Sequence, residues 1–310
     1  MAVDVRVVVA ILLSGDGQHV LLTQRKPSQD HAGLWEFPGG KIAEGETEQQ
    51  ALRRELEEEL GIDLKQCFFK TRFPYHYPDK NVELNVWQVT GWESEPVGNE
   101  GQNVQWFPIQ AIMSLPLVPA DAGIARGLNL PSGYAITPDL PEDLEYVIRQ
   151  IENQYLIEPF LLQIRFMNAP EASEYLLQYA RQRNWPVLVS RNIELANKYQ
   201  TGLHLSSAQL QAFDCRPVAA DQLLGASVHD ELQMRRAIEL GVDFVVLSPV
   251  QKTGSHPSVC PLGWASFESL VNRSPIPVYA LGGMAKHDIH QAQRLGGQGI
   301  AGISCYFPDK

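Results

Sequence analysis

Residues 40–62 read GKIAEGETEQQALRRELEEELGI, and this stretch constrains the fold and the chemistry more than any other part of the chain. Thr47 is followed three residues later by Gln50, which is the pattern of a capping box at the start of a helix. Residues 48–60 are nearly all good helix formers, and Gly61 supplies a C-terminal stop. The stretch therefore predicts a helix over 48–60.

The predicted helix has an acidic face beside an apolar face. At about 100° per residue, Glu55, Glu58 and Glu59 fall within an arc of roughly 100°. The adjacent arc can face a core, and it holds Leu52, Leu56 and Leu60. Carboxylates at these spacings repel one another, and a bound cation would neutralise them. Hard oxygen ligands of this kind suit Mg²⁺ or Mn²⁺.

The same stretch resembles the Nudix box, G-x5-E-x7-R-E-U-x-E-E-x-G-U, in which U is an aliphatic residue. Every fixed position is filled, from Gly40 and Glu46 through Arg54 to Gly61 and Ile62. A merely solvated acidic helix face would not require all of these residues in register. The resemblance implies an enzyme that cleaves a nucleoside diphosphate linked to another group, with divalent metal held by the box glutamates.

Composition and charge limit the classes of protein to which the chain can belong. A chain of 310 residues favours two domains, and 44% hydrophobic with 20% charged residues is typical of a globular protein. A net charge of −11 argues against binding to duplex nucleic acid or to an anionic membrane. The four cysteines are scattered, and the chain shows no signal peptide or apolar run of spanning length. We therefore expect a cytoplasmic protein with reduced thiols.

The first predicted domain, residues 1–129, has the pattern of a mixed sheet with helices. Strands are predicted over 3–13, 19–23, 66–74 and 82–92, with a loop over 93–103 and a helix over about 121–128. This α+β pattern agrees with the α/β/α sandwich that the Nudix resemblance implies.

The second predicted domain, residues 130–310, begins in a short linker over 129–133 and alternates regularly. Strands are predicted over 134–138, 160–166, 186–190, 202–206, 223–229, 244–250, 277–283 and 299–306. Helical patterns between them include 141–154, 170–184, 230–240 and 262–273. Eight alternating strands predict a small (β/α)8 barrel without a full eighth helix. A seven-stranded or open α/β sheet is the alternative.

The resemblance of the first domain extends over about residues 3–128. The segments 35–41, 73–79 and 92–102 look like those of the MutT-type 8-oxo-dGTP diphosphatases. In that family, water attacks a phosphorus of the triphosphate, and the products are nucleoside monophosphate and pyrophosphate. Metal neutralises phosphate charge and lowers the pKa of bound water in such reactions.

The resemblance assigns roles to individual residues. The positions that match metal ligands are the carbonyl of Gly39 and the side chains of Glu55, Glu58, Glu59 and Glu100. Glu46 and Arg54 match the pair that orients the box. Glu100 also matches a candidate general base. The implied cofactor is Mg²⁺, with Mn²⁺ as an alternative.

Base recognition is assigned to Arg25, Phe37, Lys80 and Asp121, which lie where the family contacts the nucleotide. Phe37 is equally a candidate for packing on a purine face or for the core. Asp121 stands where the well-known bacterial enzymes carry Asn. A carboxylate only accepts hydrogen bonds unless it is protonated, whereas an amide donates and accepts.

Residues 134–308 resemble the thiamine-phosphate synthase and thiazole tautomerase superfamily. The matching segments are 163–165, 202–205, 224–229, 248–250, 281–283 and 301–304. In such barrels the residues after strands 7 and 8 bind phosphate through backbone N–H groups. The matching positions are Gly282, Gly283, Ile303 and Ser304, although glycines there could simply allow tight turns.

The second domain also departs from that superfamily. Met167 replaces a Lys, Ser190-Arg191 replaces an Asn-Asp pair, Gln209 replaces an Asp, and His256 replaces a Lys. In the synthases the two aspartates hold Mg²⁺ and pyrophosphate, so we expect no ordinary synthase activity. His229 or the pair Ser255-His256 could act as an acid or base in a tautomerase-like reaction.

These observations predict a Mg²⁺-dependent hydrolase that sanitises oxidised purine nucleoside triphosphates, most simply 8-oxo-dGTP. One alternative is a Nudix enzyme for another nucleoside diphosphate derivative or for a thiamine-pathway compound. A second concerns the barrel, which would be a phosphate-ligand sensor or a tautomerase-like enzyme. The preferred base, the barrel ligand, the coupling of the domains and the oligomeric state stay open at this point.

Overall fold

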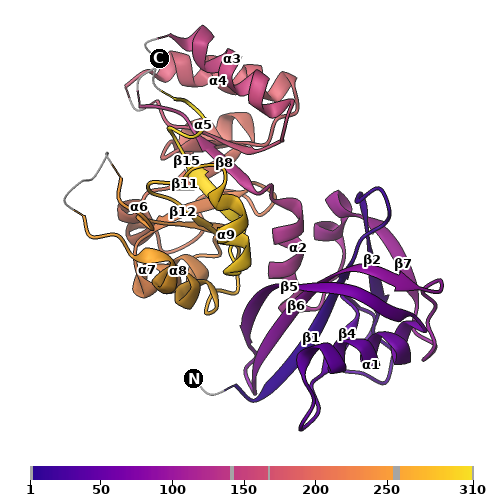
Figure 1. Cartoon of the computed structure of the whole chain (residues 1–310). Helices are drawn as coiled ribbons and strands as arrows, with labels where there is room; N and C mark the ends of the chain where they lie inside the picture. Colours follow the sequence, from indigo (N-terminus) through magenta and orange to yellow (C-terminus); the bar gives the residue numbers. More distant parts are fainter. Residues whose placement is uncertain (1–2, 140–142, 167, 254–258, 309–310) are drawn as a thin grey trace. The chain divides into compact units, whose positions relative to one another are not determined.

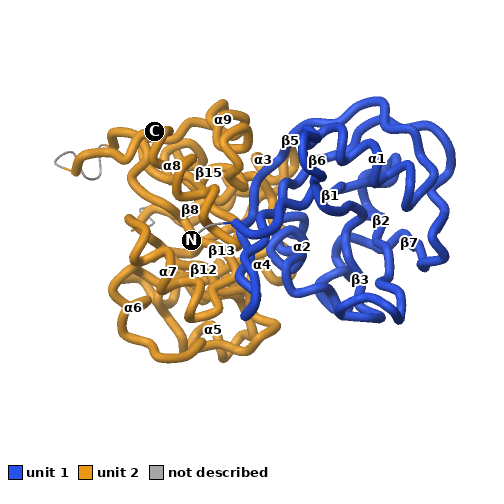
Figure 2. Tube along the Cα trace, turned by 90° about the horizontal axis from the view of Figure 1, so that it is seen from below, with its two compact units in different colours: residues 1–129 blue, residues 130–310 orange. Residues whose placement is uncertain are grey.

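A computed structural model describes residues 3–139, 143–166, 168–253 and 259–308. The chain forms two compact units, residues 1–129 and residues 130–310, which Figure 2 distinguishes by colour. Each unit has its own sheets, helices and core.

The first unit contains two sheets. The larger has the order β4-β1-β6-β5, formed by β1 (Val5–Leu12), β4 (Gly39–Lys41), β5 (Asp63–His76) and β6 (Asn81–Glu93). The smaller has the order β3-β2-β7, formed by β2 (His19–Gln24), β3 (Trp35–Glu36) and β7 (Val104–Pro108). Two α-helices and two 3₁₀ segments complete the unit: α1 (Glu48–Leu60), α2 (Ala122–Asn129), η1 (Ile109–Ser114) and η2 (Pro119–Asp121).

Strand β1 is the centre of this unit because it is buried on both faces. Its even-numbered residues pack in one core with the α1 leucines: Val8, Ala10 and Leu12 with Leu52, Leu56 and Leu60. Its odd-numbered residues pack in a second core with α2: Val9 and Ile11 with Ile124 and Ala125. Each fully buried Leu or Ile contributes about 1.5–3 kcal/mol. One helix thus covers each face, and the predicted α/β/α sandwich is confirmed (Figure 1).

The second unit is a closed barrel of eight parallel strands. They are β8 (Gly133–Ile136), β9 (Leu161–Ile164), β10 (Val187–Ser190), β11 (Gly202–Leu205), β12 (Leu224–Val228), β13 (Phe244–Leu247), β14 (Val278–Ala280) and β15 (Gly299–Gly302). Strand β15 pairs with β8, so the predicted barrel is confirmed and the open sheet is wrong.

Helices alternate with these strands. They are α3 (Leu144–Tyr155), α4 (Pro170–Gln182), α5 (Ile193–Tyr199), α6 (Ser207–Ala212), α7 (Glu231–Glu239), α8 (Gly263–Val271) and α9 (Asp288–Arg294). Through residue 308 the described chain adds no helix after β15. Residues 141 and 142, at the start of the helix predicted over 141–154, lie outside the described residues.

The barrel interior contains a polar network among aromatic rings. The hydroxyl of Tyr134 lies 3.0 Å from Nδ1 of His204, and Nε2 of His204 lies 2.9 Å from Oγ of Ser227. Burial lowers the pKa of His204 to about 3, so the ring is neutral at physiological pH. Both ring nitrogens are satisfied, which is what a buried imidazole requires.

Candidate active site

Helix α1 is capped at both ends, by side chains at its N-terminus and by Gly61 at its C-terminus. Oγ1 of Thr47 accepts a hydrogen bond from the N–H of Gln50 at 3.3 Å, and Oε1 of Gln50 accepts from the N–H of Thr47 at 2.9 Å. Gly61 adopts a left-handed conformation (φ 65°), and its N–H donates to carbonyls of the last turn. The register of the box glutamates on the helix follows from these two caps.

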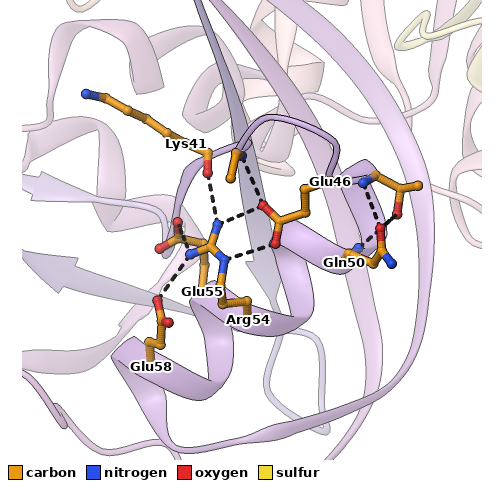
Figure 3. A network of polar contacts seen from close by, with 8 residues as sticks. Lys41, Glu46, Gln50, Arg54, Glu55 and Glu58 are labelled. Carbon is orange, nitrogen blue, oxygen red and sulfur yellow. Dashed lines mark hydrogen bonds and ion pairs between the residues drawn. The ribbon is translucent and has the colours of Figure 1, made fainter.

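Arg54 is the hub of the polar contacts on α1 (Figure 3). Its Nε and Nη2 donate to the two carboxylate oxygens of Glu46 at 2.9 and 3.0 Å, which is a bidentate pair. Nη2 also donates to the carbonyl of Lys41 at 3.1 Å. Nη1 donates to Glu55 at 2.8 Å and to Glu58 at 3.1 Å. One guanidinium thus ties the loop before α1 to two carboxylates on the helix.

The carboxylates behind Arg54 are buried to different depths. Burial raises the pKa of Glu55, although the hydrogen bond from Arg54 opposes the shift. Burial raises the pKa of Glu59 to about 8, against a hydrogen bond that Glu59 accepts from the N–H of Gly39 at 3.2 Å. The negative charges of Glu36, Glu55 and Glu100 add to this rise. The acidic face therefore concentrates like charge that a cation would relieve.

Gly39 and Gly40 leave room for this cluster. Gly39 has φ 145°, and a Cβ there would lie 2.1 Å from the carbonyl oxygen of Val8. A Cβ on Gly40 would lie 2.3 Å from the carboxylate carbon of Glu55. Any larger residue at position 40 would displace the Glu55 carboxylate, so the glycine of the box has a steric reason.

Glu100 comes from a loop before β7 and is close enough to Glu59 to raise its pKa. It forms an ion pair with Nζ of Lys26 at 2.8 Å. Lys26 was missed by the sequence analysis, because nothing in the pattern around a single lysine 74 residues away indicates the pairing.

The donor set fits a divalent cation that also binds substrate. Within the described ranges, no group of three or more His, Cys, Asp or Glu side chains is placed so that it could hold a metal ion by itself. Mg²⁺ commonly binds one or two carboxylates and completes its shell with water and substrate phosphates. Glu55, Glu58 and Glu59 offer oxygens on one helix face, and burial raises the pKa of both Glu55 and Glu59.

The predicted base-contacting residues have different surroundings. The side chain of Phe37 is 4% exposed and belongs to the core. Its backbone N–H donates to Oδ2 of Asp121 at 3.0 Å. Burial raises the pKa of Asp121 to about 8. Arg25 pairs with Glu36, and Nζ of Lys80 lies 5.4 Å from the centre of the Tyr77 ring.

Tyr77 is a further residue that the sequence analysis missed. Burial raises the pKa of its phenol, and the carboxyl of Asp121 contributes to the rise. Its ring lies 5.6 Å from that of His31 in a stacked arrangement. The phenol of Tyr77 is therefore close enough to Asp121 for the carboxyl to affect its pKa.

The barrel has a cavity of about 780 Å³ at the carboxyl ends of its strands. All four predicted phosphate-binding residues line it: Gly282, Gly283, Ile303 and Ser304. Both glycines have positive φ, and a Cβ at Gly283 would lie 2.3 Å from the carbonyl oxygen of Lys252. The tight turn therefore requires glycine whether or not these residues bind phosphate.

The substituted positions of the barrel fall in two groups. Arg191 lines the cavity, and Gln209 donates to the carbonyl of Arg191 at 3.0 Å. Met167, Ser255 and His256 lie outside the described residues. His229 also lines the cavity, and its Nδ1 lies 2.7 Å from the carbonyl oxygen of Ser248. Ser227 is a lining residue that the sequence analysis did not single out.

Comparison with protein families matches both units. The NUDIX domain model matches residues 4–128, and the thiamine monophosphate synthase model, TMP-TENI, matches residues 134–306. The chain belongs to both families. Its first unit is a Nudix pyrophosphohydrolase that acts on nucleotides, and its second unit is a TMP-TENI barrel.

Individual relatives cover one unit each. The 8-oxo-dGTP diphosphatase of Haemophilus influenzae is 40% identical over 124 residues, which are 40% of this chain and 90% of the relative. The CTP pyrophosphohydrolase of Escherichia coli is 37% identical over 114 residues, which are 37% of this chain and 84% of the relative. The solved thiamine phosphate pyrophosphorylase of Pyrococcus furiosus is 23% identical, covers 56% of this chain and 85% of that chain, and has a TM-score of 0.43.

No helix in the described part of the chain is long and apolar enough to span a membrane.

Proposed function

We propose that the Nudix unit hydrolyses oxidised purine nucleoside triphosphates, with 8-oxo-dGTP as the main substrate, to nucleoside monophosphate and pyrophosphate. The observation that carries the proposal is the Arg54 hub, which holds the glutamates of α1 on one face at fixed register. The likeness to an 8-oxo-dGTP diphosphatase supports the substrate. The four cysteines are free thiols, which supports a cytoplasmic location.

In this proposal, Glu55, Glu58, Glu59, Glu100 and the Gly39 carbonyl hold Mg²⁺, for which Mn²⁺ can substitute. The cation, when bound, neutralises phosphate charge and lowers the pKa of the attacking water. Glu46 and Arg54 position the ligands through the bidentate pair and take no part in proton transfer. Glu100 lies on a loop with its side chain partly exposed, and its alternative role to metal binding is that of the general base once Lys26 releases it.

Asp121 is proposed to read the purine in its neutral form. With a pKa raised to about 8, its carboxyl is protonated at physiological pH. A protonated carboxyl donates one hydrogen bond and accepts others, which is the pattern an amide offers. Asp121 therefore replaces the family's Asn without loss of the donor and acceptor that purine recognition needs.

A second candidate substrate is CTP, because the CTP pyrophosphohydrolase is nearly as similar as the diphosphatase. Intermediates of thiamine metabolism are a third, given the fused barrel. A panel of 8-oxo-dGTP, dGTP, CTP, ADP-ribose and thiamine diphosphate, with Mg²⁺ or Mn²⁺, separates these candidates. We expect the highest kcat/KM for 8-oxo-dGTP, and a preference for CTP or thiamine diphosphate would overturn the proposal.

We also propose that the barrel binds a phosphate-bearing ligand and does not form thiamine phosphate. Gly282, Gly283 and Ser304 line the cavity, which supports phosphate binding through their backbone N–H groups. The loss of both metal-binding aspartates, at Arg191 and Gln209, argues against the synthase reaction. Assaying the whole chain with the pyrimidine diphosphate and thiazole phosphate substrates tests this, and robust thiamine phosphate formation would contradict it.

A further inference from the structure

The barrel cavity has two arginines on the part of its rim that follows β9 and β10. Arg165 and Arg191 both line the cavity. Arg165 forms an ion pair with Asp139 at 3.1 Å. In the described residues, the guanidinium of Arg191 has neither a hydrogen bond nor an ion pair. Asp139 is the one carboxylate among the described lining residues, so this rim carries an unmatched positive charge.

The two arginines are close enough to affect each other. Burial lowers the pKa of Arg165, Asp139 opposes the shift, and the charge of Arg191 adds to it. Two cations facing one cavity repel each other until an anion enters between them. The positive charge of these two side chains therefore favours the binding of an anionic ligand in the cavity.

The backbone of Arg191 is held in an unusual conformation. Its φ is 61°, in the left-handed region that a long side chain rarely occupies. Its N–H donates to the carbonyl of His204 at 2.9 Å, and its carbonyl accepts from Nε2 of Gln209 at 3.0 Å. Gln209 is itself anchored, because its Oε1 accepts from the N–H of Ser206 in the capping box of α6. Such strain persists only where the surroundings fix it, and it concentrates at functional sites.

Arg191 and Gln209 are also the two positions where the sequence departs from the metal-binding aspartates of the resembled synthases. We propose that Arg191, positioned by Gln209, is a fixed cation that replaces the divalent metal, so that the barrel binds a diphosphate group without Mg²⁺. This inference rests on the proposal that the cavity binds a phosphate-bearing ligand. It adds that the ligand carries a diphosphate group and that Arg191 is the cation that binds this group.

The chemistry of the rim favours a diphosphate. A guanidinium matches two phosphate oxygens with its planar fork, and Arg165 offers a second fork beside it. Ser206, Ser207 and Ser227 line the same cavity, and the hydroxyl of Ser207 can donate to a remaining oxygen. The volume of about 780 Å³ leaves room for the organic part of the ligand.

The test is calorimetric titration of the full chain with inorganic pyrophosphate, in buffer that contains a chelator and no divalent cation. We expect saturable binding of one pyrophosphate. Arg191→Asn removes the guanidinium and places a residue that tolerates the left-handed conformation, so we expect unchanged or higher thermal stability. Its affinity should fall at least about tenfold, as for a lost charged hydrogen bond. Arg235→Gln is the matched control, because Arg235 pairs with Glu231 on the surface of α7.

The positioning role of Gln209 is tested by a double-mutant cycle. Gln209→Ala should weaken pyrophosphate binding in the native background and have no further effect in the Arg191→Asn background. A purely structural role in capping α6 would give the same loss in both backgrounds. Arg191→Asp with Gln209→Asp should lose binding in chelator and show binding that depends on added Mg²⁺.

Three results would overturn the proposal: no binding in chelator, binding that requires Mg²⁺ in the native chain, or equal affinity in the Arg191→Asn and Arg235→Gln variants. Because no divalent cation is present, none of these results depends on nucleotide hydrolysis. Failure here therefore leaves the proposed Nudix reaction untouched, and failure of the nucleotide panel leaves this test valid.

Discussion

Asp121 illustrates how one residue's environment can change its chemistry. The sequence shows a carboxylate where an amide is expected, and from that alone the base preference stays open. In the structure Asp121 is buried, with 5% of its surface exposed, and it accepts a hydrogen bond from the Phe37 N–H. Burial depends on residues far apart in the chain, and no local pattern around position 121 contains it. The pKa of about 8 follows from that burial.

Asp121→Asn should remove a pH dependence of substrate selectivity. In the native chain Asp121 is protonated below about pH 8, and above that pH its carboxylate can no longer donate a hydrogen bond. The ratio of kcat/KM for 8-oxo-dGTP over dGTP should therefore change as pH rises through 8. Because the folded pKa lies above the ordinary value of 3.8, the neutral carboxyl's contribution to the free energy of unfolding is complete below that pH and is lost progressively as pH rises to about 8. If this ratio changes with pH in the variant as it does in the native chain, Asp121 does not read the base.

Glu58→Gln should lower kcat by orders of magnitude and leave the fold intact. The change keeps the side-chain volume and removes one proposed metal ligand from an exposed position on α1, where its native partner is Arg54 at 3.1 Å. Glu57→Gln is the matched control, since Glu57 is exposed on the same helix and lies outside the acidic arc. Rates at saturating Mg²⁺ and thermal melts check the prediction, and equal rates for the two variants would contradict it.

Among the elements, those with a strong local signal were predicted well. The helix expected over 48–60 is α1, because its capping box and its terminal Gly61 are adjacent to it in sequence. Strands β3 and β4 were missed, since two or three residues show no periodicity. The strand predicted over 66–74 extends over Asp63–His76, because polar residues at its ends also pair with β6. No local sequence pattern indicates that pairing, so the prediction was too short.

The approach of β4 to α1 gives a prediction about Gly40. In Gly40→Ala the new Cβ would lie 2.3 Å from the carboxylate carbon of Glu55, so this side chain must move away. We expect kcat/KM to fall at least about tenfold, as for a misplaced catalytic group. Gly15→Ala is the control, because a Cβ on Gly15 would meet no other atom within 4 Å. Stable, folded Gly40→Ala protein with native kcat/KM would show that Glu55 need not stay where it is.

For the molecule as a whole, the regular alternation of strands and helices was enough to predict the barrel. Eight strand patterns in one half of a chain leave few topologies, and closure satisfies both edges of the sheet. Contacts between distant residues could not be predicted in the same way. Lys26 and Glu100, or Arg191 and Gln209, meet only because the folded backbone brings distant segments of the chain together.

The two units also predict an outcome for a truncated chain. Residues 1–129 form a compact unit with two apolar cores of their own, one on each face of the β4-β1-β6-β5 sheet. All the residues assigned to nucleotide hydrolysis lie within it. We therefore propose that residues 1–129 fold alone and hydrolyse 8-oxo-dGTP with a kcat/KM equal to that of the whole chain. Steady-state rates on both proteins, with the Glu58→Gln variant of each as the blank, make the comparison. If the short protein melts cooperatively but its kcat/KM is more than tenfold lower, the barrel contributes to catalysis and the units are not independent.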